Sequence, residues 1–178
     1  MEALRKQEEY EYTVEDILSL PDGDRAELID GQIYYMSSPG TGHQRLLVYL
    51  CNQIYNYIEE NDGECEVFAA PFAVFLNSDN RNYVEPDIAV ICDKDKISEQ
   101  GCDGAPDWVI EIVSPSSRSM DYYKKLFKYR TAGVREYWVV DPERKVTTVY
   151  QFEDDSMTEY AFGEEITVGI YKGFSIRV

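Results

Sequence analysis

Apolar residues recur along this chain at helical spacing in some segments and in short continuous runs in others. The strongest helical pattern extends from His43 to Glu60. Its apolar residues fall three or four positions apart: Leu46, Leu47, Leu50, Ile54, Tyr57 and Ile58. A shorter helix is expected to begin after Thr13, because Thr13-Val-Glu-Asp16 resembles a capping box, and to end near Leu20.

A third helix is predicted from Met120 to Ala132. Gly133 is a natural C-terminal stop for it, and three residues are expected to face the core: Leu126, Phe127 and Tyr129. The order strand, loop, strand, crossover helix and strand between Val84 and Val140 predicts a parallel or mixed sheet. The expected fold class is therefore an α/β domain with a mixed central sheet and helices packed against it.

Short β-branched and aromatic runs predict the strands. Asp30-Gly31 lies between two apolar runs in residues 25–36, and this dipeptide is the strongest short-range signal for a hairpin. The other extended segments are expected at residues 65–76 (interrupted at Pro71), 87–92, 108–113, 135–141 and 145–152, with two or three short strands in the tail. Residues 93–104 are expected to form a polar loop.

Two of the apolar segments carry a carboxylate. Glu111 lies in the middle of Trp108-Val-Ile-Glu-Ile-Val113, and Asp87 opens the strand before it. A carboxylate among apolar neighbours is costly to bury unless it is paired, protonated or bound to a cation. Glu111 could form a salt bridge with an arginine, or face solvent on a one-sided strand. Alternatively, Asp87 and Glu111 lie side by side on neighbouring strands and bind a metal ion.

A shared cation would relieve the repulsion between two adjacent carboxylates. Mg²⁺ or Mn²⁺ suits oxygen ligands best. Such an ion can lower the pKa of a bound water and neutralise charge that develops on a phosphate, as phosphodiester hydrolysis requires. The candidate constellation is therefore Glu27, Asp87, Glu111 and a lysine from the helix that follows the Glu111 strand.

Composition limits what the chain can be. Its 178 residues are 44% hydrophobic and 13% aromatic, which suffices for one globular domain over residues 1–178 with a sizeable core. The N-terminus is polar and no apolar run approaches membrane-spanning length, so a cytoplasmic protein is expected. The formal net charge of −17 opposes a broad electrostatic grip on nucleic acid.

The cysteines and the single histidine give weak signals. Cys51, Cys65, Cys92 and Cys102 have no CxxC spacing, so neither a zinc site nor a disulfide framework is expected. We expect them to be reduced thiols in or near the core. His43 stands near the start of the long helix, where it could orient a carboxylate or phosphate, or serve as an ordinary structural hydrogen-bonding residue.

Several motifs together resemble a nuclease family. Glu85-Pro-Asp87 followed by Glu111-Ile-Val113 is similar to the PD-(D/E)xK motif of restriction-endonuclease-like nucleases, with valine where that motif has lysine. More closely, the chain resembles the Uma-type family of putative restriction endonucleases over nearly its whole length. The matching stretches are Glu27-Leu-Ile-Asp-Gly31, His43, Pro86-Asp-Ile88, Glu111-Ile-Val-Ser-Pro-Ser116, Asp121, Lys125 and Gly133-Val-Arg-Glu-Tyr-Trp138.

The resemblance implies roles for the matching residues. Asp87 and Glu111 would bind the metal, with the backbone carbonyl of Ile112 as a third protein ligand. Glu27 would lie nearby, directly or through water. The valine of the motif cannot supply an ammonium, so the catalytic lysine would come from the adjoining helix, where Lys125 matches the family position.

Residues around this set carry less specific expectations. Only one of Lys124 and Lys125 is expected to face the site, and Glu85 and Asp121 are expected to pair with that lysine. The polar residues after the Glu111 strand could contact a phosphate backbone, or cap the helix that follows: Ser114, Ser116, Ser117 and Arg118.

We therefore expect a restriction endonuclease-like fold and a divalent-metal-dependent endodeoxyribonuclease that acts on DNA, as a homodimer because nucleases of this fold often cut two strands as a pair. One alternative, favoured by the acidic charge, is a catalytically lapsed nucleic-acid-binding or regulatory module. Another is a metal-dependent hydrolase of small phosphate compounds. An intact set of Asp87, Glu111 and Lys125 favours an enzyme, and a steep salt dependence of DNA affinity would favour a nuclease.

Overall fold

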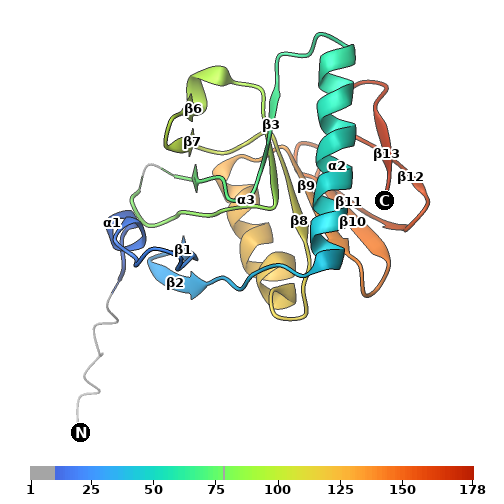
Figure 1. Ribbon diagram of the computed structural model, residues 1–178. Coiled ribbons are helices and arrows are strands. Elements are labelled where there is room, and N and C mark those ends of the chain that lie inside the picture. Colours follow the sequence, from blue (N-terminus) through green and yellow to red (C-terminus); the bar gives the residue numbers. More distant parts are fainter. Residues whose placement is uncertain (1–10, 78) are drawn as a thin grey trace, which may run out of the picture.

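A six-stranded sheet forms the centre of the molecule (Figure 1). The computed structural model describes residues 11–77 and 79–178. From edge to edge the strands are β11 (Ser156–Ala161), β10 (Val146–Gln151), β9 (Glu136–Asp141), β8 (Trp108–Ile112), β5 (Ile88–Ile91) and β3 (Glu66–Ala69). Strands β8 and β9 are parallel, and the other neighbouring pairs are antiparallel. The expected α/β fold with a mixed central sheet is confirmed.

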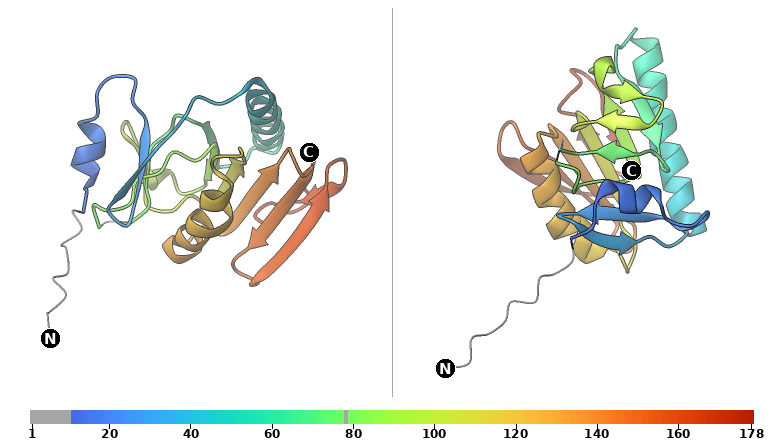
Figure 2. Two further views of the ribbon diagram at one scale, coloured as in Figure 1. Left: turned by 90° about the horizontal axis from the view of Figure 1, so that it is seen from below. Right: turned by 90° about the vertical axis from the view of Figure 1, so that its left-hand side faces the viewer.

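Helices cover both faces of this sheet (Figure 2). They are α2 (Thr41–Glu60) on one face and, on the other, the π-helical segment η2 (Met120–Lys125) with its continuation α3 (Leu126–Ala132). The short helix α1 (Val14–Leu18) does not cover the sheet and packs in a separate small hydrophobic cluster. Side chains alternate between the faces of a strand. Accordingly, Trp108 and Ile110 of β8 pack against α2, whereas Val109 between them packs in the core that includes Tyr129 of α3. Gly133 ends α3 with φ 99°, as expected.

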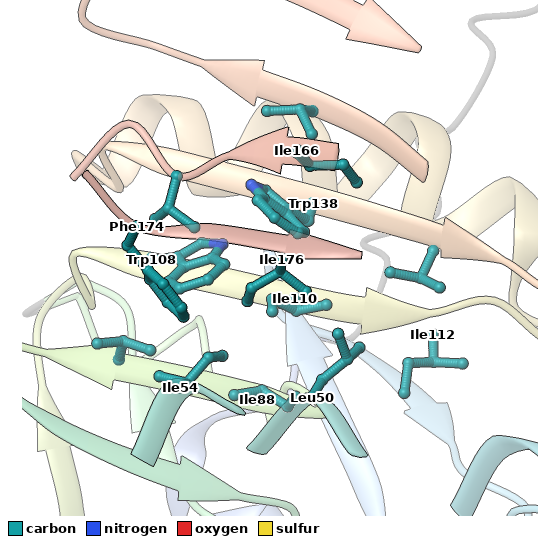
Figure 3. Close-up of a cluster of buried hydrophobic side chains, with 14 of the residues drawn as sticks. Leu50, Ile54, Ile88, Trp108, Ile110, Ile112, Trp138, Ile166, Phe174 and Ile176 are labelled. Atoms are coloured by element: carbon teal, nitrogen blue, oxygen red, sulfur yellow. The ribbon is translucent and has the colours of Figure 1, made fainter. Parts of the chain in front are cut away.

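The core beneath α2 is built around two tryptophans (Figure 3). The rings of Trp108 and Trp138 lie 4.9 Å apart between centroids, and both side chains are fully buried. The C-terminal hairpin of β12 (Glu165–Thr167) and β13 (Ser175–Arg177) adds one isoleucine from each strand to this core. Because burying a large apolar side chain stabilises a protein by about 1.5–3 kcal/mol, this core holds β8 firmly in place.

A β-hairpin lies beside the face of the sheet that is covered by α3. Strands β1 (Ala26–Ile29) and β2 (Gln32–Tyr35) pair around Asp30 and Gly31, which both have positive φ, so the predicted hairpin is confirmed. The α1 helix precedes it, and the Thr13 N–H donates to the Asp16 carboxylate at 2.8 Å. Two backbone hydrogen bonds between Leu28 and Tyr83 attach β1 to the segment that leads into β5.

One predicted loop contains secondary structure. Residues 93–104 form a 3₁₀ turn (Lys94–Lys96) and two short strands, β6 (Ile97–Ser98) and β7 (Gly101–Asp103), which make a small sheet with β4 (Val74–Phe75). The expectation of a plain polar loop was therefore wrong. Tertiary pairing decides the structure here, because β7 finds a partner in β4, which is distant in the sequence.

The expectation of four reduced cysteines was also wrong. Cys65 and Cys92 form a disulfide. The strand register explains this disulfide. Glu66 pairs with Ile91 across the antiparallel strands β3 and β5, so Cys65, just before Glu66, lies opposite Cys92, just after Ile91. Cys51 and Cys102 are free thiols, half-buried and buried respectively.

Phe127 does not face the core as predicted, since it remains 62% exposed. Lys125 and Tyr129 are buried, and a residue midway between two inward-facing positions four apart points to the opposite side of a helix. The expected inward position of Tyr129 is confirmed. Among the described residues, we find no helix with the length and apolar character that crossing a bilayer requires.

Candidate active site

Asp87 and Glu111 lie beside each other on neighbouring strands. Ile88 of β5 pairs with Ile110 of β8, so Asp87 and Glu111 follow at the next position of this antiparallel register. The Ile112 N–H donates to Oδ2 of Asp87 at 2.7 Å, which fixes that carboxylate at the end of β8. The side chain of Asp87 is 16% exposed and that of Glu111 5%, so solvent reaches the pair from the Asp87 side.

Lys125 lies between two glutamates. Its Nζ is 2.8 Å from Oε1 of Glu27 and 2.9 Å from Oε1 of Glu111. The Lys125 side chain is only 5% exposed, whereas the neighbouring Lys124 is exposed. Of the two lysines, the structure therefore places Lys125 against the carboxylates. It lies at the end of the π-helical segment, a form of helix that is rare and often occurs at functional sites.

Two further groups complete this cluster. The Tyr129 hydroxyl donates to Oε1 of Glu111 at 2.6 Å, and Oδ1 of Asp121 is 3.9 Å from the Lys125 ammonium. Tyr129 was expected only as a core residue. Its position four residues after Lys125, on the same helical face, is the sequence signal that could have indicated its contact with Glu111.

His43 contacts Asp87 from the first turn of α2. Its Nε2 lies 3.0 Å from Oδ2 of Asp87, and its Nδ1 is buried without a hydrogen-bond partner. The hydrogen bond to Asp87 is the main cause that raises the pKa of the imidazole above its ordinary value, and burial opposes it. The sequence left open whether His43 orients a carboxylate or phosphate or is an ordinary structural residue, and its contact with Asp87 favours a histidine that orients a carboxylate.

The cluster carries excess negative charge. Three carboxylates interact with the ammonium of Lys125, those of Glu27, Glu111 and Asp121, and a fourth, that of Asp87, lies next to Glu111. Burial raises the pKa of Glu111 well above its ordinary value, against the opposing effect of Lys125. Burial alone would lower the pKa of Lys125, but its carboxylate neighbours outweigh burial and raise it, so the lysine is charged.

Glu85 does not pair with the lysine, and that expectation was wrong. Its carboxylate accepts hydrogen bonds from Arg25 at 2.5 Å and from the Tyr83 hydroxyl at 2.8 Å. Only the backbone of Glu85 touches the cluster, because its N–H donates to Oε1 of Glu27 at 3.0 Å. The Glu85 carboxylate is therefore engaged by Arg25 and Tyr83 instead of Lys125.

The turn after β8 is occupied by its own hydrogen bonds. The Ser114 N–H donates to Oγ of Ser117 at 3.0 Å, and the Ser117 N–H donates to Oγ of Ser114 at 3.2 Å. Arg118 forms ion pairs with Asp141 at 3.2 Å and Glu143 at 2.6 Å. These contacts favour the structural explanation for the serines and leave the arginine engaged with two carboxylates.

The carboxylate and carbonyl oxygens of the expected metal site are ligands of the kind that a hard cation prefers. No group of three or more His, Cys, Asp or Glu side chains in residues 11–77 and 79–178 is arranged to hold a metal. The expected site requires two carboxylates, Asp87 and Glu111, together with the backbone carbonyl of Ile112. The contacts above engage Oδ2 of Asp87 and Oε1 of Glu111, and the second oxygen of each carboxylate takes part in none of them. Such an all-oxygen set fits Mg²⁺ or Mn²⁺, since Mg²⁺ commonly uses one or two carboxylates and retains several waters.

Comparison with known proteins identifies relatives of this chain. The sequence model of the Uma2 family, described as "Putative restriction endonuclease", matches residues 14–178. The uncharacterized protein slr1290 of Synechocystis sp. is 28% identical over 134 residues, which cover 74% of this chain and 68% of that protein. The crystal structure of a putative nuclease belonging to DUF820 from Anabaena variabilis has the same fold, with a TM-score of 0.72 over 89% of each chain at 22% identity. Because the family match spans nearly the whole sequence, the chain belongs to the Uma2 family.

Proposed function

We propose that this protein is a Mg²⁺- or Mn²⁺-dependent endodeoxyribonuclease that hydrolyses DNA phosphodiester bonds. The family description and the putative nuclease of the same fold support a nuclease. The observation that carries the proposal is the buried Lys125 held between Glu27 and Glu111, with Asp87 next to Glu111 on the adjacent strand. Buried carboxylates in excess of the available positive charge favour binding of a cation.

Each residue of the cluster then has a role. Asp87, Glu111 and the Ile112 carbonyl would hold the ion, which when bound lowers the pKa of a water molecule and neutralises charge on the phosphate. Lys125 keeps its proton and supplies a fixed positive charge beside Glu111. There it can offset the negative charge that develops on the phosphate when water attacks it. Glu27 holds the lysine through its 2.8 Å ion pair.

Tyr129 and His43 support the two metal-binding carboxylates. Tyr129 donates to Glu111, and His43 contacts Asp87, so each carboxylate is oriented by a neighbour from a helix. Groups that orient ligands in this way commonly affect metal affinity and activity by about 10–100-fold. These contacts support the proposed role of both carboxylates as metal ligands.

Cleavage of supercoiled plasmid tests the proposal. The wild-type protein should nick and linearise the plasmid with Mg²⁺ or Mn²⁺ and not with EDTA, and Asp87→Ala should abolish this activity. Asp103→Ala removes an exposed acidic residue elsewhere and serves as the matched control. If the purified wild type leaves the plasmid intact both with Mg²⁺ and with Mn²⁺, a catalytically lapsed binding module becomes the better account. If the protein hydrolyses small phosphate esters instead of DNA, a metal-dependent hydrolase of small phosphate compounds becomes the better account.

A further inference from the structure

A cleft of about 450 Å³ opens between the β1–β2 hairpin and the outer side of the η2–α3 helix. This size lies in the range of roughly 300–1,000 Å³ that is typical of small-ligand sites. The helix contributes two aromatic and two basic residues: Tyr123, Phe127, Lys124 and Lys128. The hairpin contributes Ile29, Asp30, Gln32 and Tyr34.

The cleft adjoins the candidate active site through the hairpin. Glu27 and Tyr34 are directly paired across β1 and β2, so their side chains lie on the same face about 4.5–5.5 Å apart at Cβ. Glu27 contacts the buried Lys125, and Tyr34 contacts the neighbouring Lys124. A molecule in the cleft would therefore lie one side chain away from the catalytic cluster.

The aromatic residues of the cleft are unusually exposed. Tyr123 is 73% exposed and Phe127 62%, and the two residues lie four positions apart on the helix. Single exposed apolar residues are ordinary on a protein surface, but several that line one cleft indicate a binding site. Neither ring contributes to the cores described above, so the fold does not account for them.

Positive charge accompanies the rings. The Lys124 ammonium lies 4.4 Å from the centroid of the Tyr34 ring, and Lys128 forms an ion pair with Asp30 and lies 5.9 Å from the centroid of Phe127. The lining thus has two lysines and one carboxylate, in a chain whose formal net charge is −17. This local excess of positive charge suits an anionic ligand with flat rings.

We propose that the cleft binds an unpaired nucleotide of the DNA substrate, an inference that rests on the proposed nuclease function. The base would stack on Tyr123 and Phe127, and the adjoining phosphate would be held by Lys124 and Lys128. Bases within a duplex already stack on one another, so a platform of exposed rings selects single-stranded DNA, such as an overhang, a flap or a bubble, next to the cleaved bond.

Fluorescence anisotropy with a labelled oligothymidylate tests this inference on the full chain, with EDTA present to prevent cleavage. Stacking on aromatic side chains strengthens binding enough that Tyr123→Ala combined with Phe127→Ala should raise the Kd about tenfold or more. The affinity for a blunt duplex should change much less. Tyr55→Ala, which removes an exposed tyrosine of α2 outside the cleft, should leave both affinities unchanged.

A second matched pair tests the charges. Lys128→Gln should weaken binding of the oligothymidylate, whereas Lys94→Gln, at an exposed lysine that pairs with Glu66, should not. The inference is overturned if the wild type does not bind the oligothymidylate, or if the double variant binds it as well as the wild type does. It is also overturned if Tyr55→Ala and Lys94→Gln weaken binding as much as the cleft variants do. Failure of plasmid cleavage by the wild type would instead count against the nuclease function, whatever the cleft binds.

Discussion

Lys125 is the residue on which the proposed chemistry depends most. The valine at position 113 cannot donate a proton or offset charge, so an ammonium must come from elsewhere. Lys125 supplies one from the adjoining helix, 2.9 Å from Glu111 and almost completely buried. A buried lysine needs partners to stay charged, and the adjacent glutamates provide them.

Lys125→Ala should reduce plasmid cleavage by about 10²-fold or more, the scale seen when one positioned electrostatic group is lost. Metal affinity should not fall, because the substitution removes a positive charge from beside Glu111 and leaves the proposed ligands in place. Lys124→Ala, at an exposed position, should cost far less. Equal losses in the two variants would refute the role assigned to Lys125. Cleavage rates and Mn²⁺ titrations provide the two readouts.

Asp121 should make stability depend on pH. Burial raises the pKa of its carboxyl group from 3.8 to about 6, against the opposing effect of Lys125. The folded protein then binds more protons than the unfolded chain between about pH 4 and 6, so the contribution of this group to stability falls as pH rises through that range. Asp121→Asn removes this titration, and its Tm relative to wild type should rise between pH 4 and 7 in EDTA. A difference in Tm that stays constant with pH would contradict this.

The sequence predicted the central residues but not all of their contacts. Glu27, Glu111 and Lys125 meet, as the resemblance to the nuclease family implied; the apolar spacing predicted the strand and the helix but not this contact. Glu85 was misjudged because side-chain direction next to a proline depends on the local backbone. The hydrogen bond from Tyr129 to Glu111 was missed, although the spacing of four residues from Lys125 places both side chains on one helical face.

Two elements carry the cluster toward the sheet, the β1–β2 hairpin with Glu27 and the η2–α3 helix with Lys125. Neither belongs to the central sheet. The hairpin is held by its backbone bonds to Tyr83 and by the ion pair of Arg25 with Glu85. Correct docking of the hairpin therefore determines whether Glu27 reaches the lysine.

Gly31→Ala should destabilise the protein by about 1–2 kcal/mol, because position 31 has φ +75° and an L-residue is strained there. A Cβ would also lie 3.2 Å from Cβ of Glu11 and 3.3 Å from the Tyr12 carbonyl oxygen. Urea unfolding measures the loss. Gly42→Ala, at a helical position of α2 where a Cβ would meet nothing within 4 Å, should instead stabilise by up to about 1 kcal/mol. If both substitutions destabilise equally, backbone strain at the hairpin is not the cause.

At the level of elements, local patterns predicted the long helix and the hairpin but not the register of β3 with β5. The α2 helix and the Asp30-Gly31 hairpin follow from strong local patterns. The disulfide between Cys65 and Cys92 depends on the register of β3 with β5, which no local signal reveals. The exposure of Phe127 follows from the docking of its helix, which turns Tyr129 inward.

At the scale of the whole molecule, negative charge and DNA binding must be reconciled. A net charge of −17 repels a polyanion over most of the surface, so substrate contacts must be local. The proposed cation at Asp87 and Glu111 and the lysines of the cleft would supply such contacts. DNA affinity should therefore fall as the salt concentration rises, because salt weakens contacts between lysines and phosphates.

The dimer remains a prediction. Static light scattering at micromolar concentration should give twice the chain mass of 20.6 kDa. The chain has 15 tyrosines, a residue type that is enriched at protein interfaces. A scattering mass that stays at one chain across this concentration range would refute the dimer, without bearing on the active-site cluster.

Calorimetric titration of Mn²⁺ tests most directly the claim that Asp87 and Glu111 share one cation. The wild type should bind one ion at this site, and Asp87→Asn should lose that binding while keeping the Tm of the metal-free fold. Asp103→Asn, at an exposed acidic residue, controls for weak surface binding. Loss of the site in Asp87→Asn alone is the result that we predict. Unchanged Mn²⁺ affinity in Asp87→Asn would contradict the account and place any metal site elsewhere.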